Sequence, residues 1–199
     1  MSDRVFGEIP EVSVGTVFAN REELSHSGVH RPTQAGISGA QDEGADSIVL
    51  SGGYEDDKDY GDEIIYTGKG GQDPVSRKQV ADQTLTGQNM ALAVSCQEGL
   101  PVRVVRGTSH RSPFSPRSGY RYEGLYIVER FWREKGAAGL TVWRFNLIKQ
   151  SEQSVSTEEH RQLTISSGNA TPERIHRVAG PSDRPRYPFE WSDQNHLRL

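Results

Sequence analysis

Cysteine is almost absent from this chain of 199 residues, in which Cys96 is the only one. A single cysteine excludes a disulfide within the chain and any zinc site built on several cysteines. Long hydrophobic runs are also missing: no apolar stretch approaches the ~18 residues of a membrane span, and no secretion-type signal opens the chain. We expect a soluble, intracellular protein with no membrane contact, cofactor, bound metal or small-molecule substrate.

The chain also lacks the net positive charge common in nucleic-acid-binding proteins, because its formal charge is −4. The charge is unevenly distributed, however. Residues 1–100 hold 7 Lys and Arg against 17 Asp and Glu, whereas residues 101–150 hold 10 against 3. Phosphate affinity depends on local charge, so the second segment could supply a basic surface. Each arginine of this segment could contact phosphate, or could instead be an ordinary solvent-exposed residue on the face of a strand. These candidates are Arg103, Arg106, Arg111, Arg117, Arg121, Arg130, Arg133 and Arg144.

Strand signals dominate the secondary structure. Runs of β-branched and aromatic residues bounded by Gly, Pro or Ser predict strands at 47–50, 63–67, 102–105, 122–131 and 140–148. Asn20 and Glu23 form a capping box for one short helix, and a second follows Thr86 and ends at Gly99. Many strands and few helices predict an α+β, β-rich fold with a curved sheet or open barrel.

The composition changes near residue 150. We expect residues 1–150 to form one domain and residues 151–199, which are polar and rich in Ser, Glu, Pro and Arg, to form a C-terminal extension. Tyr187, Phe189 and Trp191 alternate near its end and are too apolar for a free linker. The extension is therefore predicted to pack on the core.

Residues 51–71 form the most informative segment, because two tyrosines flank an acidic turn that has glycines at both ends. The rings of Tyr54 and Tyr66 can sandwich a flat ligand, and glycines let backbone approach closely. The Asp57 carboxylate can accept a hydrogen bond from an amino group. These are the components needed to hold a nucleobase outside its stack. The alternative for both tyrosines is ordinary strand packing.

A calcium loop is a rival explanation of the acidic turn. Counted from Asp57, Asp59 fits the third position of such a loop, but Gly61 occupies the fifth, where an oxygen ligand is required. The pattern therefore fails. The carboxylates left over are expected to be solvated turn residues: Asp56, Asp59, Asp62 and Glu63.

Further motifs extend the pattern over roughly residues 6–150. In order they are GEIP at 7–10, VGT at 14–16, SGVHRP at 27–32, AGI at 35–37, PVRVVR at 101–106, RYEGLY at 121–126, WREKG at 132–136 and VWR at 142–144. With residues 51–71, they resemble the SRA (SET- and RING-associated, or YDG) domain, a reader of 5-methylcytosine in DNA. The resemblance implies a twisted, PUA-like β-barrel flanked by short helices.

The resemblance also implies roles for individual residues. Tyr54 and Tyr66 would stack on a flipped base, Asp57 would read its polar edge, and Thr67 would support that edge. The 5-methyl group would pack against a wall of small residues, where burying it is worth roughly 0.8 kcal/mol, about a fourfold preference. The modified-base pocket is thus predicted to comprise Ser51, Gly52, Gly53, Tyr54, Asp57, Tyr66 and Thr67.

In this family two loops enter the DNA from opposite grooves. The first follows the SGVHRP motif and would place Gln34 in the gap left by the flipped base, with His30 and Arg31 beside it. The second follows residues 70–73 and is shorter here than in vertebrate readers of hemimethylated DNA. It offers DNA contacts through Ser76, Arg77 and Lys78. The short tip predicts little inspection of the partner strand.

The predicted function is therefore binding of duplex DNA that contains 5-methylcytosine, without catalytic residues. The alternative is a modification-dependent endonuclease, or the recognition component of one with a nuclease partner. A nuclease of the HNH type needs a ββα context that His160, His176 and His196 lack. Neither a SET nor a RING segment is visible. We expect a prokaryotic stand-alone member, cytoplasmic and nucleoid-associated, or a nuclear protein if the source is eukaryotic.

Overall fold

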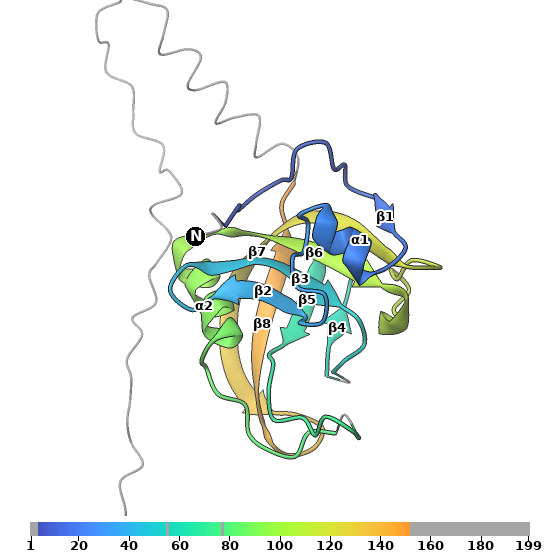
Figure 1. Cartoon of the computed structure of the whole chain (residues 1–199). Helices are drawn as coiled ribbons and strands as arrows, with labels where there is room; N and C mark the ends of the chain where they lie inside the picture. The colour runs from blue at the N-terminus through green and yellow to red at the C-terminus, as the bar shows by residue number, and fades with distance from the viewer. Residues whose placement is uncertain (1–3, 55, 77, 152–199) are drawn as a thin grey trace, which may run out of the picture. The chain divides into compact units, whose positions relative to one another are not determined.

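The longest strand, β7 (Tyr120–Lys135), joins the two halves of an eight-stranded sheet (Figure 1). Its first half pairs antiparallel with β6 (Pro101–Gly107), and its second half pairs antiparallel with β8 (Thr141–Lys149). The register with β8 shifts between Val128 and Arg130, and such a bulge bends a strand and increases its twist. The structure is a computed structural model, in which residues 4–54, 56–76 and 78–151 are described.

The sheet has the strand order β2-β3-β6-β7-β8-β5-β4, with β1 paired to β7. Neighbours are antiparallel except for β3 and β6, which are parallel. The bounds of the remaining strands are β1 (Val17–Phe18), β2 (Ile37–Ala40), β3 (Gly44–Leu50), β4 (Lys58–Asp59) and β5 (Glu63–Thr67). The α+β class is confirmed. Within the described residues the end strands β2 and β4 do not pair, so the expected barrel is an open one.

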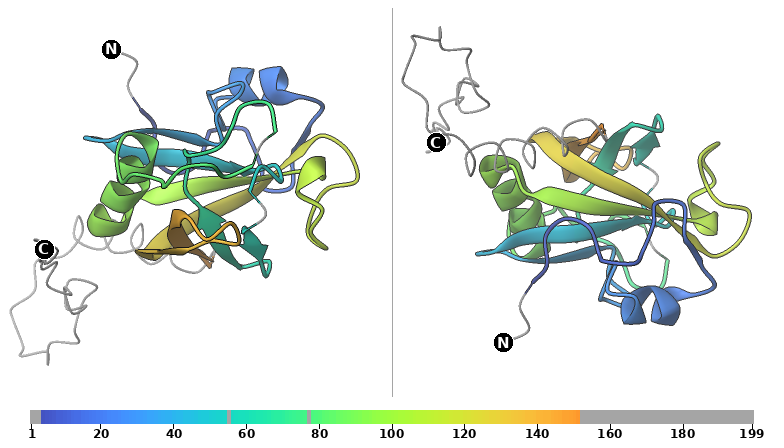
Figure 2. Two further views of the ribbon diagram at one scale, coloured as in Figure 1. Left: turned by 90° about the horizontal axis from the view of Figure 1, so that it is seen from below. Right: turned by 90° about the horizontal axis from the view of Figure 1, so that it is seen from above.

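The helices are short: α1 (Arg21–His26), α2 (Gln88–Glu98) and the 3-10 helix η1 (Thr108–His110). Asn20 caps α1 as predicted, because its Oδ1 accepts from the backbone amides of Glu22 and Glu23 at 3.0 and 2.9 Å. The second helix ends at Gly99 in the left-handed region, as expected. It packs against β2, β3 and β7, far from α1, which lies beside β1 (Figure 2).

Two apolar clusters fill the interior. The larger one lies beneath α2 and includes Ile48, Leu92, Val104 and Phe145. The smaller one lies beneath α1 and consists of Phe18, Leu24, Val29, Val49, Val105 and Tyr122. The thiol of Cys96, within α2, packs against the larger cluster, where burial raises its pKa to about 11. The only cysteine is therefore a poor nucleophile at neutral pH.

The structure divides the basic segment into buried and exposed arginines. Arg103, Arg106 and Arg144 are each no more than 2% exposed, so the prediction that they could form a phosphate-binding surface is wrong. The Arg103 guanidinium instead donates to the carbonyls of Val29 and Gly7 at 2.9 and 2.6 Å. Arg121 is half-buried. The arginines that remain at the surface are Arg111, Arg117, Arg130 and Arg133.

The predicted C-terminal extension lies outside the described residues beyond Ser151. The same region contains the three aromatic residues expected to pack on the core, Tyr187, Phe189 and Trp191. It also contains the histidines considered for a nuclease site, His160, His176 and His196. The predicted division of the chain at residue 150 therefore stays a prediction. Across the part of the chain that is described, no helix is long and apolar enough to cross a membrane.

The ion pairs of the buried Asp46 carboxylate allow a test of how much such pairs stabilise the fold. Its buried carboxylate accepts from Arg4 and Arg31 at 2.6 and 2.9 Å and lies 3.6 Å from the buried guanidinium of Arg103. Asp46→Ala leaves that guanidinium without its counter-charge, and we expect it to lower the free energy of unfolding by about 3–5 kcal/mol. Urea denaturation measures the loss. Asp62→Ala, which removes an 85% exposed side chain, should change stability by less than about 0.5 kcal/mol.

Candidate functional site

A cavity of about 460 Å³ opens between the segment that follows β3 and the segment around η1. Its volume lies within the range of roughly 300–1,000 Å³ that is typical of small-ligand pockets. The lining residues are Ser51, Gly52, Tyr54, Asp57, Ser109, His110 and Arg111. The first four were predicted from the sequence. The last three were missed, because nothing in the local sequence indicates that η1 lies against residues 51–57.

Gly52 is where the two walls of the cavity meet. Its φ is +70°, and a Cβ at this position would lie 2.4 Å from the carbonyl oxygen of Ser109. Only glycine tolerates both the backbone conformation and this close approach. The sequence predicted a wall of small residues here, and the close approach of Ser109 explains why residue 52 is glycine.

Tyr54 and its neighbour Gly53 fasten the cavity to the second loop. The Tyr54 hydroxyl accepts a hydrogen bond from the amide of Gly70 at 3.0 Å. The side-chain amide of Gln72 donates to the Gly53 carbonyl at 2.7 Å. Gly53 was predicted to line the pocket, but its observed contact is with the loop.

The carboxyl group of Asp57 is positioned by hydrogen bonds that involve Thr67 of β5 and Arg144 of β8. Its Oδ1 accepts from the amide of Thr67 at 2.8 Å, and the buried Thr67 hydroxyl accepts from Arg144 at 2.6 Å. Burial raises the pKa of Asp57 to about 6, although the hydrogen bond from Thr67 opposes the shift. Thr67 therefore orients Asp57 and does not line the cavity itself, and the support predicted for the edge of the base stays a prediction.

Tyr66 lies in the core beside the cavity. The residue is 4% exposed and belongs to the larger apolar cluster. Burial raises its pKa well above the usual value, and the charges of Asp57 and Tyr54 add to that rise. Of the two predicted stacking rings, the structure presents Tyr54 directly to the cavity.

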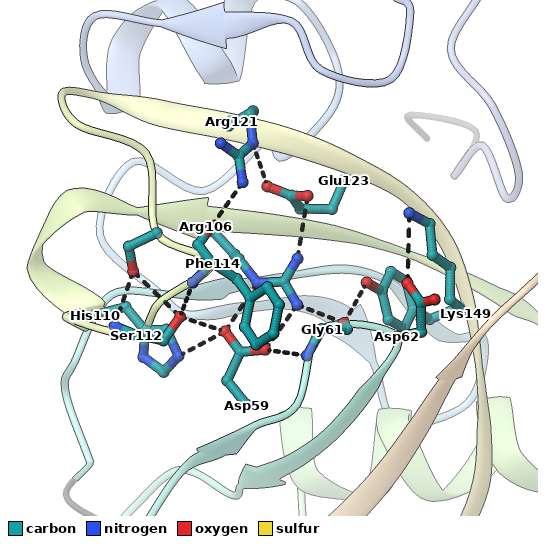
Figure 3. Close-up of polar contacts among 12 residues, drawn as sticks. Asp59, Gly61, Asp62, Arg106, His110, Ser112, Phe114, Arg121, Glu123 and Lys149 are labelled. Carbon is teal, nitrogen blue, oxygen red and sulfur yellow. Dashed lines mark hydrogen bonds and ion pairs between the residues drawn. The ribbon is translucent and has the colours of Figure 1, made fainter.

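Asp59 is the centre of a buried polar network beside the cavity (Figure 3). Its carboxylate accepts from Arg106 Nε and Nη2 at 2.9 and 2.7 Å and from the Ser112 hydroxyl at 2.7 Å. His110 Nε2 lies 3.2 Å away. The side chain is 1% exposed, so the prediction of a solvated turn residue is wrong. Burial alone would raise the pKa of Asp59, but the hydrogen bonds it accepts hold that pKa well below its usual range.

The network extends from Arg106 into β7. Arg106 Nη1 lies 3.1 Å from Glu123, and its Nη2 donates to the Gly61 carbonyl at 2.6 Å (Figure 3). The ring of Phe114 lies 5.5 Å from the same guanidinium. Because His110 lines the cavity and is bonded to Asp59, this network fixes one cavity wall relative to the sheet.

The loop that carries Gln34 is anchored by buried contacts. His30 is fully buried, and its ring nitrogens lie 2.9 Å from the Ser47 hydroxyl and 2.9 Å from the Ala35 carbonyl. Burial lowers the pKa of His30 to about 3, so it is neutral at physiological pH. The prediction that His30 contacts DNA is wrong, because the residue has no exposed surface. Gln34 itself is exposed, and its predicted insertion into the DNA stays a prediction.

Helix α1 holds the same loop from the other side. Arg21 Nη2 donates to the carbonyls of Pro32, at 2.9 Å, and Ala35, and Ser25 donates to the Arg31 carbonyl at 2.6 Å. The carbonyls flanking Gln34 are thus fixed from α1. The Arg31 side chain is about one-third exposed while it pairs with Asp46, so it can still reach a ligand.

The second loop carries the other predicted DNA contacts. Ser76 and Lys78 are exposed, and Arg77 lies outside the described residues. The carboxylate of Asp73 accepts from the amides of Val75 and Ser76 at 3.2 and 2.6 Å and closes the turn at the tip. Within the described residues, no group of three His, Cys, Asp or Glu side chains is placed to hold a metal ion.

The fold and the cavity agree with one family. The SAD/SRA domain matches residues 5–153, and the chain belongs to this family. The E3 ubiquitin-protein ligase UHRF1 of Danio rerio is 45% identical over 170 residues, which make up 75% of this chain and 22% of that protein. A UHRF1-like protein of Cryptococcus neoformans is 45% identical over 162 residues, 75% of this chain and 47% of that protein. The chain thus spans less than half the length of these relatives.

Solved structures give the same result. The modification-dependent restriction endonuclease TagI is 50% identical, with a TM-score of 0.74, and the match covers 77% of this chain and 55% of that one. The SRA domain of SUVH5, solved in complex with methylated CHH DNA, is 41% identical, with a TM-score of 0.62. That match covers 73% of this chain and 94% of the other.

Removing the Arg21 clamp should loosen the Gln34 loop. Arg21→Met keeps a long side chain but removes the donors to the Pro32 and Ala35 carbonyls. We expect the backbone order parameters of residues 33–35, measured by ¹⁵N relaxation, to fall from about 0.85 towards 0.6. Arg130→Met removes an exposed arginine that stacks on Trp132 and should leave them unchanged. Unaltered order in Arg21→Met would assign the rigidity of the loop to His30.

The raised pKa of Asp57 predicts that the free energy of unfolding depends on pH. Between the unfolded value of about 3.8 and the folded value of about 6, the folded state binds more protons at this site, so the contribution of Asp57 to stability falls as pH rises. Asp57→Asn removes the titration. The stability of this variant relative to the unsubstituted protein should therefore increase from pH 4 to pH 6 and then level off. Urea denaturation across this range checks it, and a flat difference would contradict the assignment.

Proposed function

We propose that this chain binds duplex DNA containing 5-methylcytosine and holds the modified base, flipped from the stack, in the Tyr54–Asp57 cavity. The observation that carries the proposal is the cavity itself. It combines an aromatic ring, an oriented carboxylate and a wall of small residues. The SUVH5 domain, whose fold and sequence this chain resembles, was solved with methylated DNA.

The chemistry of the cavity suits cytosine. The carboxylate of Asp57, once deprotonated, accepts a hydrogen bond from the exocyclic amine of the base. Stacking on Tyr54 contributes roughly 1–3 kcal/mol, comparable with the few kcal/mol that flipping requires. Tyr66 would close the opposite side, which requires its ring to become more exposed than the 4% seen here. The 5-methyl group would pack near Ser51 and Gly52, the small residues that line the cavity.

The surface around the cavity provides the remaining contacts. Gln34 would occupy the space vacated by the base, and Arg31, Ser76 and Lys78 would contact the backbone. Arg77, predicted for the same task, stays a proposal from the sequence. Since the flipped base is bound by shape and one polar edge, we expect little dependence on neighbouring base pairs.

A second function deserves a test because of TagI, a modification-dependent restriction endonuclease that shares 50% identity with this chain. This chain covers 55% of that enzyme. It would correspond to the recognition part of such an enzyme, acting with a nuclease partner or a further nuclease segment. Binding to genomic DNA would place the protein at the nucleoid, or in the nucleus of a eukaryotic cell.

The test is a gel shift with unmethylated, hemimethylated and fully methylated duplexes in several sequence contexts. We expect a preference for methylated DNA, and Asp57→Ala should lower that affinity by about 5- to 100-fold, since the base amine loses its acceptor in a buried site. Asp62→Ala, with an exposed carboxylate nearby, should bind normally. Equal affinity of folded Asp57→Ala would remove Asp57 from base reading. Metal-dependent cleavage of methylated DNA would favour the nuclease function.

A further inference from the structure

The turn that carries two of the cavity-lining residues is closed only weakly by its own backbone. Tyr54 and Asp57 stand at its two ends, and the Asp57 amide donates to the Tyr54 carbonyl at 3.4 Å, which is long for such a bond. Thr67 orients the Asp57 carboxyl group, and the Gly70 amide donates to the Tyr54 hydroxyl, but both of these contacts act on the ends of side chains. The backbone between the two residues is left to other contacts.

Asp56 supplies such a contact from within the turn. Its carboxylate does not line the cavity but reaches the hairpin that joins β7 to β8, where Oδ1 accepts from the Ala137 amide at 3.1 Å. A Cβ at Gly136 would lie 2.7 Å from Asp56 Oδ2, so the carboxylate occupies the space beside this glycine. Asp56 was predicted to be a solvated turn residue, but it is only partly exposed, and its partner lies 81 positions along the chain.

The β7–β8 hairpin is itself held in place. The Gly136 amide donates to the Leu140 carbonyl at 2.9 Å and closes the hairpin. Next to this closure, the Thr141 amide donates to the Asp82 carboxylate at 2.6 Å, and the Thr141 carbonyl accepts from the Gln83 amide at 2.9 Å. The hairpin is thus attached to the segment that follows the second loop, and it offers the turn a fixed support.

Other roles fit Asp56 less well. The phosphate backbone repels a carboxylate, so the side chain is unsuited to a direct contact with DNA. It also belongs to no group of three metal-binding side chains within the described residues. The hydrogen bond from the Ala137 amide therefore gives the best indication of what this carboxylate does.

We propose that Asp56 is a positioning residue: it ties the turn to the β7–β8 hairpin and thereby holds the Asp57 carboxylate where it can accept from the amine of the flipped base. Asp56 itself does not touch the base. This role rests on the proposed function, and it makes base reading depend on a hairpin that does not line the cavity. Because the contact is a single hydrogen bond, its loss should weaken binding several-fold rather than abolish it.

The test compares Asp56→Ala with Asp56→Asn, which removes the charge but keeps an oxygen that can accept from the Ala137 amide. Fluorescence anisotropy gives the affinity for a duplex with one 5-methylcytosine and for a duplex of the same length that contains only A·T pairs. Asp56→Ala should bind the methylated duplex about 3- to 10-fold more weakly and the A·T duplex unchanged. Asp56→Asn should stay within about twofold of the unsubstituted protein on both duplexes.

Gly136→Ala tests the same contact from the side of the hairpin. The added methyl group would displace the Asp56 carboxylate, so we expect the loss of affinity seen with Asp56→Ala. Ala138→Ser, at an exposed position of the same hairpin, should bind both duplexes normally. Urea denaturation of each variant verifies that it is folded.

The carboxyl ¹³C signal of Asp57, followed by NMR as the pH changes, reports the state of the turn in the free protein. In the unsubstituted protein and in Asp56→Asn, we expect the Asp57 carboxyl group to titrate with a pKa of about 6. In Asp56→Ala its pKa should be lower, since a loosened turn lets water reach the carboxylate. Asp56→Asn separates this effect from the loss of a neighbouring charge, because the charge is absent from both variants.

Unchanged affinity of Asp56→Ala for the methylated duplex would overturn the positioning role. Equal losses in Asp56→Ala and Asp56→Asn, an equal loss on the A·T duplex, or an unmoved Asp57 titration would do the same. Failure of the proposed function looks different: the unsubstituted protein would then bind the methylated and A·T duplexes equally, while the Asp57 titration would still respond to Asp56→Ala.

Discussion

The buried ion pair between Arg106 and Asp59 is the interaction on which the cavity depends. Desolvating two charges is costly, and the attraction compensates only when the remaining hydrogen-bonding groups are also satisfied. Here all three guanidinium nitrogens of Arg106 and both carboxylate oxygens of Asp59 have partners, which include Glu123, Ser112 and the Gly61 carbonyl. The pair links β6 to β4, and His110 extends it to the cavity wall. The cavity wall around η1 is thereby tied to the sheet.

The two loops beside the cavity are anchored in different ways. The Gln34 loop depends on α1 and on His30, which connects it to β3 through Ser47. The second loop, which begins at Gly70, is anchored to the cavity wall by hydrogen bonds with Tyr54 and Gly53. One loop can therefore change in length or sequence without disturbing the other.

Local sequence signals predicted much of the fold. The β-branched run at 63–67 coincides with β5, and Asn20 caps α1 as its side chain suggested. Tyr54 and Asp57 were found because their spacing lies within one short segment. The failures involve contacts distant in sequence: His30 and Asp59 are polar residues that become buried only because partners 17 to 53 positions away satisfy them. No local pattern distinguishes such residues from solvated ones. For the same reason, the sequence did not predict that residues 109–111 line the cavity.

The hydrogen bond from the Gly70 amide to the Tyr54 hydroxyl gives the molecule a form of cooperativity. Tyr54 lines the cavity in which we propose that the base is held, and Gly70 begins the second loop, for which DNA contacts are predicted. If this hydrogen bond forms only when loop and ring are both in place, ordering one favours ordering the other. By thermodynamic reciprocity, whatever free energy the duplex gains by ordering the loop must appear equally as tighter retention of the base. Base retention and groove contact are therefore two measures of one coupled equilibrium.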